Sequence, residues 1–276
     1  MNAPGQAGQT GMGCPAGAGE TKVIMVKFQP YAHLPGGFSQ NDGTIDFYGR
    51  INSLLRGDMR VLDLGAGRAA WFEDDPSAYR RSLRLLKGKV AEVIATDVDE
   101  AVQQNRSCDR ALLMEDGIIP LEDNSVDMVI ADYVLEHVDD ADGFRAEVSR
   151  VLRPGGYFCA RTPHKWSYVS VLARLLGNAH HIPILSRAQP DRKAVDVFPT
   201  RYRLNTLHTV RSCFAGFEDF SLIYRPDPAY YFGNRSLYHA LGFLHRLMPA
   251  ALSGGLFVFL QKPGRAPGRP EHKASC

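Results

Sequence analysis

The stretch Val61-Leu62-Asp63-Leu64-Gly65-Ala66-Gly67-Arg68 decides the fold of this 276-residue chain. Apolar residues with one acid among them run directly into two glycines, which is typical of a buried parallel strand that ends in a tight turn. The glycines let the backbone approach a ligand where a Cβ atom would obstruct it. The stretch therefore predicts a strand with a ligand bound at its carboxyl end.

A second short apolar strand, Val93-Ile94-Ala95-Thr96-Asp97, also ends in an acid. At this place in a nucleotide-binding sheet, a carboxylate accepts hydrogen bonds from ribose hydroxyls. The other role open to Asp97 is to cap the helix that follows, but Asp99 is better placed for that. The two strand ends together predict a ligand that contains a nucleoside.

The composition is that of a globular protein, with 45% hydrophobic and 22% charged residues. A net charge of +2 is too small to indicate a nucleic-acid partner. The five cysteines are widely spaced and form no CxxC pair, which argues against both a disulfide framework and a zinc site. We expect a cytoplasmic protein from a reducing compartment.

The first residues are rich in Gly, Ala, Gln and Pro and the last in Pro, Gly, Arg and Lys, so we expect disordered tails at residues 1–20 and 263–276. The first tail lacks the basic and apolar regions of a signal peptide. Elsewhere no apolar run reaches the roughly 18 residues that a membrane-spanning helix needs. Residues 21–262 are expected to form one domain.

Strands and helices alternate along that domain, which predicts a doubly wound α/β fold with a mostly parallel, seven-stranded sheet. The expected strands are Arg60–Leu64, Glu92–Asp97, Ala111–Met114, Val126–Ala131, Tyr157–Arg161, Phe217–Tyr224 and Leu256–Gln261. The expected helices are Asp46–Leu55, Ser77–Leu86, Glu100–Arg106, Phe144–Leu152, Trp166–Leu176 and Thr206–Phe214. The alternation stops after strand 157–161, and we expect an insertion there that lies over the strand ends.

With these elements in place, the chain resembles the class I S-adenosylmethionine (SAM) dependent methyltransferases, in particular the small-molecule branch that includes ubiquinone-pathway enzymes. Four blocks carry the resemblance within residues 58–163, and several blocks in order are far stronger evidence than one glycine motif. They are Val61–Gly67, Ile94–Asp97, Ile119–Asp127, and Val134–Val138 together with Val151–Gly156.

The resemblance implies that SAM binds along the carboxyl ends of the strands. The implied contacts are Asp63, Gly65 and Gly67 at the methionine end, Asp97 at the ribose, Glu115, Asp116 and Gly117 at the adenine, and Asp132 and Tyr133 at the methyl-donating end. Ala69 departs from the family pattern because it replaces the third glycine of the turn. The segment between the first two strands is also longer and more polar than usual.

The methyl acceptor is expected to be a small molecule, held between segments 163–205 and 227–247. His164, which follows a strand, is the best candidate for a general base, ahead of His180 and His181, although packing histidines are commoner. Further candidates for substrate binding are His137, Tyr202 and Arg203, with a cap and a surface charge as the competing roles of the last two.

No metal is expected at Glu136-His137, because Tyr133 stands where some relatives place another acid; a structural helix start is the favoured interpretation. The segment 227–247 carries an apolar stripe with basic residues, which permits a peripheral membrane contact but more often forms core or an oligomer contact.

Two other functions remain open at this point. A complete SAM site without an acceptor would make the protein a non-catalytic regulatory module. Gly65–Ala70 also fits the G-x-G-x-x-A pattern of nicotinamide enzymes, but the downstream blocks have no role in such a protein.

Overall fold

The computed structural model describes residues 28–172, 174, 199–229 and 231–264. Within them, one sheet has the strand order β3-β2-β1-β4-β5-β8-β6, and β7 also pairs with β8. The strands are β1 (Arg60–Leu64), β2 (Glu92–Asp97), β3 (Arg110–Leu113), β4 (Val126–Asp132), β5 (Leu152–Pro163), β6 (Glu218–Asp219), β7 (Leu222–Tyr224) and β8 (Gly255–Gln261).

Strands β1 to β5 run parallel to one another, and β8 runs antiparallel to β5, β6 and β7. This arrangement confirms the expected α/β fold with a mostly parallel sheet. The expected strand Phe217–Tyr224 is divided into β6 and β7. The division lies at Phe220 and Ser221, where the carboxylate of Asp219 accepts the N–H of Ser221 and turns the chain.

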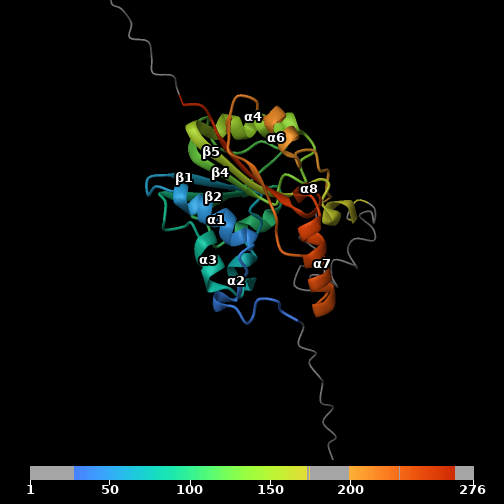
Figure 1. Cartoon of the computed structure of the whole chain (residues 1–276). Coiled ribbons are helices and arrows are strands. Elements are labelled where there is room, and N and C mark those ends of the chain that lie inside the picture. Colours follow the sequence, from blue (N-terminus) through green and yellow to red (C-terminus); the bar gives the residue numbers. More distant parts are fainter. Residues whose placement is uncertain (1–27, 173, 175–198, 230, 265–276) are drawn as a thin grey trace, which may run out of the picture.

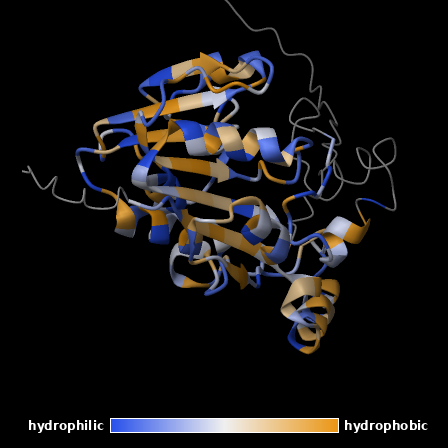
Figure 2. Cartoon of the chain, turned by 90° about the horizontal axis from the view of Figure 1, so that it is seen from above, coloured by the Kyte–Doolittle hydropathy of each residue, from blue (hydrophilic) through white to orange (hydrophobic). Residues whose placement is uncertain are grey.

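Helices cover both faces of the sheet, with α4 and α6 on one face and α1 and α3 on the other (Figure 1). The helices are α1 (Gly43–Leu54), α2 (Trp71–Asp74), α3 (Ala78–Arg84), α4 (Ala141–Val151), α6 (Leu207–Cys213), α7 (Arg235–Leu247) and α8 (Ala250–Ser253), and short 3₁₀ turns lie at η1 (Pro35–Gly37) and η2 (Glu100–Gln104). Helix α7 stands apart from the sheet (Figure 2).

Capping side chains set where several helices begin. Asp140 accepts the N–H of Gly143, so α4 begins three residues before the expected Phe144. Asp42 caps α1 in the same way through Thr44 and Ile45. The expected helix start at Glu136-His137 is wrong, because these residues form a turn and Asp140 is the cap.

Two hydrophobic clusters fill the spaces between the sheet and its helices. Alternate residues of a strand point to opposite faces, so Leu62 and Leu64 enter the cluster beneath α4 and α6, and Val61 enters the one beneath α1. By the same alternation, Asp63 shares the face of Val61. The carboxyl ends of the strands therefore carry polar residues on an otherwise apolar face.

Several expectations lie wholly or partly outside the described residues: the tail at 1–20, most of the tail at 263–276, the histidines 180 and 181, and the middle of the 163–205 insertion. The expected helix Trp166–Leu176 is helical at 168–172 and 174, and its last two residues are not described.

Replacing Phe47 by alanine is expected to lower the free energy of unfolding by about 3–5 kcal/mol. The ring is fully buried and lies 5.5 Å from that of Phe257 and 5.7 Å from that of Phe259, measured between centroids. Urea unfolding of Phe47→Ala measures the loss. The control is Tyr79→Ala, because Tyr79 of α3 is half-exposed. Equal losses in both variants would contradict the central place of Phe47.

Candidate active site

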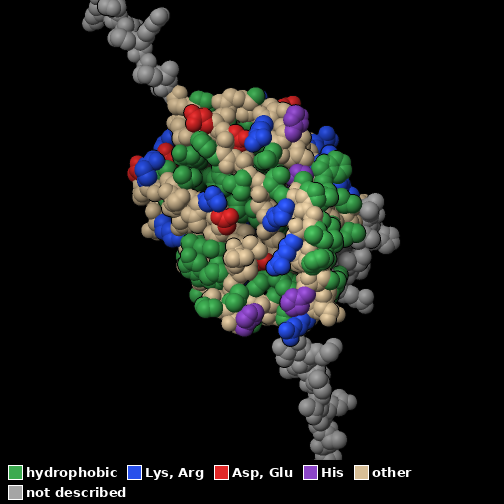
Figure 3. All heavy atoms as spheres, in the orientation of Figure 1, with side chains coloured by type: hydrophobic (Ala, Val, Ile, Leu, Met, Phe, Trp, Pro, Cys, Tyr) green, Lys and Arg blue, Asp and Glu red, His purple; other side chains and the backbone are tan. Residues whose placement is uncertain are grey.

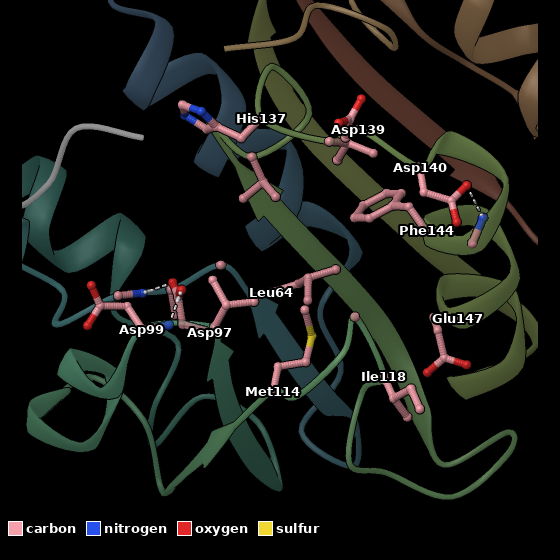
Figure 4. Close-up of a pocket in the computed structure, with 18 of the residues that line it drawn as sticks. Leu64, Asp97, Asp99, Met114, Ile118, His137, Asp139, Asp140, Phe144 and Glu147 are labelled. Carbon is pink, nitrogen blue, oxygen red and sulfur yellow. Dashed lines mark hydrogen bonds between the residues drawn. The ribbon is translucent and has the colours of Figure 1, made fainter. Parts of the chain in front are cut away.

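The carboxyl ends of β1, β2 and β4 open into a pocket of about 840 Å³ (Figure 4). The structure brings together at its walls the predicted residues Gly65, Gly67, Asp97, Asp116, Gly117, Tyr133 and His137. Figure 4 shows Asp97 and Asp99 at one end and Phe144 and Glu147 at the other, with Leu64 and Met114 between them. A pocket of this size holds a ligand as large as a nucleoside with a side chain.

The turn after β1 has no room for a larger residue at its first glycine. Gly65 has a φ of +71°, and its N–H donates to the carbonyl oxygen of Thr96 at 2.7 Å. A Cβ atom on Gly65 would lie 2.5 Å from Cγ2 of Val134. Ala69, which replaces the third family glycine, adopts the left-handed φ of +52° that a glycine would take freely. The substitution therefore leaves the turn in place.

Asp97 closes the same turn through its carboxylate. Its Oδ2 accepts the N–H of Gly67 at 2.8 Å and its Oδ1 accepts the N–H of Asp99 at 3.0 Å. Asp99 caps the following turn by accepting the N–H of Ala101, as expected from the sequence. Each Asp97 oxygen has capacity for a further hydrogen bond, which is what a ribose diol requires.

The other end of the pocket is apolar with a polar rim. Its walls include Met114, Ile118 and Phe144. Asp116 and Gly117 adopt left-handed φ angles of +50° and +75°, which shapes the loop after β3 around the opening. Glu115 lies next to this loop but does not line the pocket. Of the two acids expected near an adenine, Asp116 is therefore the one in position.

A buried ion pair lies beside the pocket on the α1 face of the sheet. The guanidinium of Arg161 donates to both carboxylate oxygens of Asp132, at 2.7 and 2.8 Å. Burial opposes the charge of Asp132, but Arg161, Arg84 and the hydroxyl of Tyr48 together hold its pKa below the usual range. Asp132 does not line the pocket, because its carboxylate is committed to these partners.

Asp63 lies on this same face, where Asp132 and Asp97 are its acidic neighbours. Burial, followed by the charge of Asp132, raises the pKa of Asp63 to about 7, and Arg84 opposes the rise. A carboxylate with so raised a pKa gains free energy from any cation that binds beside it. The ammonium group of a methionine moiety is such a cation.

Arg84 and Trp71 were not singled out from the sequence. The guanidinium carbon of Arg84 lies 4.5 Å from the ring centroid of Trp71 and 5.3 Å from that of Tyr48, and one of its nitrogens is 3.4 Å from Asp132. Its buried Nε has no hydrogen-bond partner. No local pattern distinguishes Arg84 from the other basic residues of α3. Arg161 did carry a signal, as an arginine at the end of an apolar strand.

The three residues expected to bind the substrate do not all lie at the pocket. His137 lines the pocket, and its Nδ1 lies 2.9 Å from the carbonyl oxygen of Pro199, so this nitrogen carries the proton and donates. Tyr202 is buried, with a φ of +54°. Arg203 is paired with Asp139 at 2.7 Å on the surface. Neither of the last two lines the pocket, whereas Arg201 does.

His164 is also buried outside the pocket lining. Its ring Nδ1 accepts the backbone N–H of Trp166, and the backbone N–H of His164 donates to the carbonyl oxygen of Gly254. Burial lowers the pKa of His164 and so favours the neutral ring. A role as general base stays a prediction, and the pocket gives it no support.

The strand order and the strand-end pocket define a class I methyltransferase fold. A family profile described as "Methyltransferase domain" matches residues 62–160, the part of the chain that builds most of the pocket. Residues 62–160 of this chain therefore carry a methyltransferase domain of the class I, SAM-dependent kind.

Curated relatives agree with this assignment over shorter stretches. A protein of Mycolicibacterium smegmatis described as an S-adenosylmethionine-dependent methyltransferase is 46% identical over 50 residues, which is 18% of this chain and 20% of the relative. The ubiquinone/menaquinone biosynthesis C-methyltransferase UbiE of Acidiphilium cryptum is 34% identical over 114 residues, or 33% of this chain and 46% of the relative. The chain thus spans less than half the length of the curated relatives it matches.

Among solved structures, the chain is similar to one from the complex between the Haloferax volcanii Trm112 methyltransferase activator and its proposed methyltransferase. The TM-score is 0.51 and the identity 18%, with 82% of this chain and 94% of that chain covered. At this identity the likeness supports the fold alone.

Replacing Gly65 by alanine is expected to destabilise the protein by about 1–3 kcal/mol and to weaken SAM binding at least about tenfold. The new Cβ meets Val134 and the φ of +71° is strained for alanine. Thermal unfolding and SAM titration compare it with Gly57→Ala, where no atom lies within 4 Å of the added Cβ. Unchanged SAM affinity in Gly65→Ala would show that the turn does not approach the ligand.

SAM affinity is expected to fall as the pH drops from 8 to 6. The pKa of Asp63 is about 7, so lower pH protonates it and removes the charge that attracts the ammonium group. The change should approach tenfold over this range. Calorimetric titration of Asp63→Asn should show weak binding with a much flatter pH profile, while the exposed Asp58→Asn behaves like the wild type. The same profile in Asp63→Asn would assign the titration to another group.

Proposed function

We propose that this protein transfers the methyl group of SAM to a small-molecule acceptor. The observation that carries the proposal is the convergence of Gly65, Gly67, Asp97 and Asp116 on one pocket at the carboxyl ends of β1 to β3. These residues come from separate blocks of the sequence. Their meeting at one edge of the sheet has no function in a plain structural turn.

The proposed contacts with SAM come from four parts of the site. Asp63 suits the ammonium group because its carboxyl is buried beside a second acid. The Gly65 turn admits a ligand at close range since a Cβ there would fill the space against Val134. Asp97 suits the ribose, and Asp116 with the apolar walls suits the adenine. Asp63 itself does not line the pocket, whereas the groups proposed for the ribose and the adenine do.

The chemistry requires little from the protein beyond orientation. SAM supplies a methyl group that its sulfonium already activates for in-line displacement. The chain's own residues hold the reactants together and exclude water, and such alignment contributes up to about 7–11 kcal/mol in favourable systems. An acceptor that is already an anion needs no general base.

The proposed acceptor side is near Tyr133, which lines the pocket after β4, and Tyr224 at the end of β7, which lies next to Tyr133 outside the pocket lining. The ring of Tyr133 is half-exposed at the pocket, 4.8 Å from the guanidinium carbon of Arg161, and its hydroxyl lies 3.5 Å from that of Tyr224. A flat, largely apolar acceptor fits this setting. The name of the Acidiphilium cryptum relative, which concerns quinone biosynthesis, supports the same class.

A thermal-shift titration with SAM, its product S-adenosylhomocysteine, NAD and NADP tests the cofactor. SAM at about 100 times its dissociation constant should add about 2.7 kcal/mol of stability. Asp97→Ala should lose this gain because it removes the ribose acceptor, whereas the exposed Asp58→Ala should keep it. A shift with NAD or NADP alone would overturn the proposal.

An assay of methyl transfer distinguishes an enzyme from a module that binds SAM without turnover. Incubation with methyl-labelled SAM and candidate phenols, quinols and carboxylates should release S-adenosylhomocysteine and label the acceptor. SAM binding with no release of S-adenosylhomocysteine across these acceptors would favour the regulatory module.

A further inference from the structure

Helix α7 has an apolar stripe on its outer side. Leu237, Phe243, Leu244 and Leu247 are exposed by 37, 64, 42 and 67%. With the exposed Ala240, they recur at intervals of three and four residues, which places them along one side of the helix. Large apolar side chains that gather in this way mark an interaction surface.

The inner side of the same helix is anchored to the protein. The hydroxyl of Tyr238 lies 2.6 Å from that of Tyr31, and its ring lies 5.8 Å from that of Phe28. One turn from the C-terminal end, the ring of the buried His245 packs 5.3 Å from that of Tyr168. Since this side already holds α7 in place, the outer stripe is not needed to attach the helix.

Basic residues border one edge of the stripe. Arg235, His239 and Arg246 are exposed, and their positions on the helix place them side by side next to Phe243. The sequence contains no Asp or Glu between Asp227 and Glu271. The surface around the stripe is thus apolar along its length and positive along one edge.

The apolar surface continues beyond α7. Phe232, which precedes the helix, is 51% exposed, and Leu252 of α8 is 41% exposed. Figure 3 shows hydrophobic side chains gathered where Figure 1 draws α7 and α8, with Lys or Arg and His side chains beside them. We call this surface, made of Phe232, Leu237, Phe243, Leu244, Leu247 and Leu252 with Arg235, His239 and Arg246, the α7 face.

We propose that the α7 face docks on the surface of an anionic phospholipid membrane. Its stripe would enter the boundary between headgroups and acyl chains, and its basic edge would meet the lipid phosphates. No helix among the described residues is long and apolar enough to cross a bilayer, and α7 with 13 residues is about 20 Å long. The contact is therefore with one leaflet.

Charge favours lipid over a second copy of this chain. In a twofold dimer through the α7 face, the same patch of both copies would meet, which brings Arg235 and Arg246 close to their own equivalents. Like charges brought together in this way oppose association. An anionic bilayer instead complements the same residues. This inference is independent of methyl transfer.

Co-sedimentation with vesicles tests the inference. The wild type should sediment with vesicles of phosphatidylcholine and phosphatidylglycerol, and much less with phosphatidylcholine alone. Phe243→Ser/Leu247→Ser should weaken binding at least about tenfold, because two large apolar side chains no longer enter the membrane. Arg235→Glu/Arg246→Glu should also lose binding to the anionic vesicles.

A matched control tests whether vesicle binding depends on the α7 face or on exposed apolar side chains in general. Phe220→Ser/Tyr79→Ser replaces two aromatic residues that are not part of the α7 face and are 55 and 50% exposed. This variant should sediment like the wild type. Each variant is compared by its melting temperature and its SAM-induced shift, so that loss of folding is recognised.

Two results would overturn the proposal. One is equal sedimentation of the wild type and the Phe243→Ser/Leu247→Ser variant. The other is no vesicle binding by the wild type together with a dimer, measured by light scattering, that this double variant abolishes; that result would assign the α7 face to a second copy.

Discussion

The site depends on a buried ion pair at the carboxyl edge of the sheet. Asp132 and Arg161 are direct partners in the register of β4 and β5, and both side chains lie on the α1 face. Removing either one would leave the other charged and buried, which typically costs about 3–5 kcal/mol. The pair also fixes what surrounds it, because Arg161 lies under the ring of Tyr133 and bonds to Thr44 of α1.

The same register explains why Asp63 is an unfavourable residue for stability. Asp63 pairs with Ile130, so its side chain shares a face with Asp132 two residues further on. Its folded pKa of about 7 lies above the ordinary value of 3.8. The folded state therefore binds this proton more tightly, and its contribution to stability is lost as pH rises between these values. A cationic ligand bound beside Asp63 would offset that loss. The unfavourable burial of this acid is therefore explained by ligand binding.

The sequence predicted the features that depend on local chemistry, and missed those that depend on contacts between distant parts of the chain. Two glycines after a strand and an acid after the next one are local signals, and Gly65, Gly67 and Asp97 meet as expected. Arg84 joins Asp132 only because the fold brings the last residue of α3 to the end of β4. Arg203 looked available for an anion, but the fold places Asp139 beside it. Such pairings are set by the tertiary structure.

The α7 face was visible in the sequence as a stripe, but its meaning depended on the other side of the helix. An amphipathic pattern normally indicates that the apolar side is buried. Here aromatic contacts such as Tyr238 with Tyr31 bury one side, and a second apolar side remains in contact with water. Keeping Phe243 and Leu247 in water favours aggregation. Such residues are explained by a partner, and a positive edge in a stretch of sequence without acids from 228 to 270 favours an anionic one.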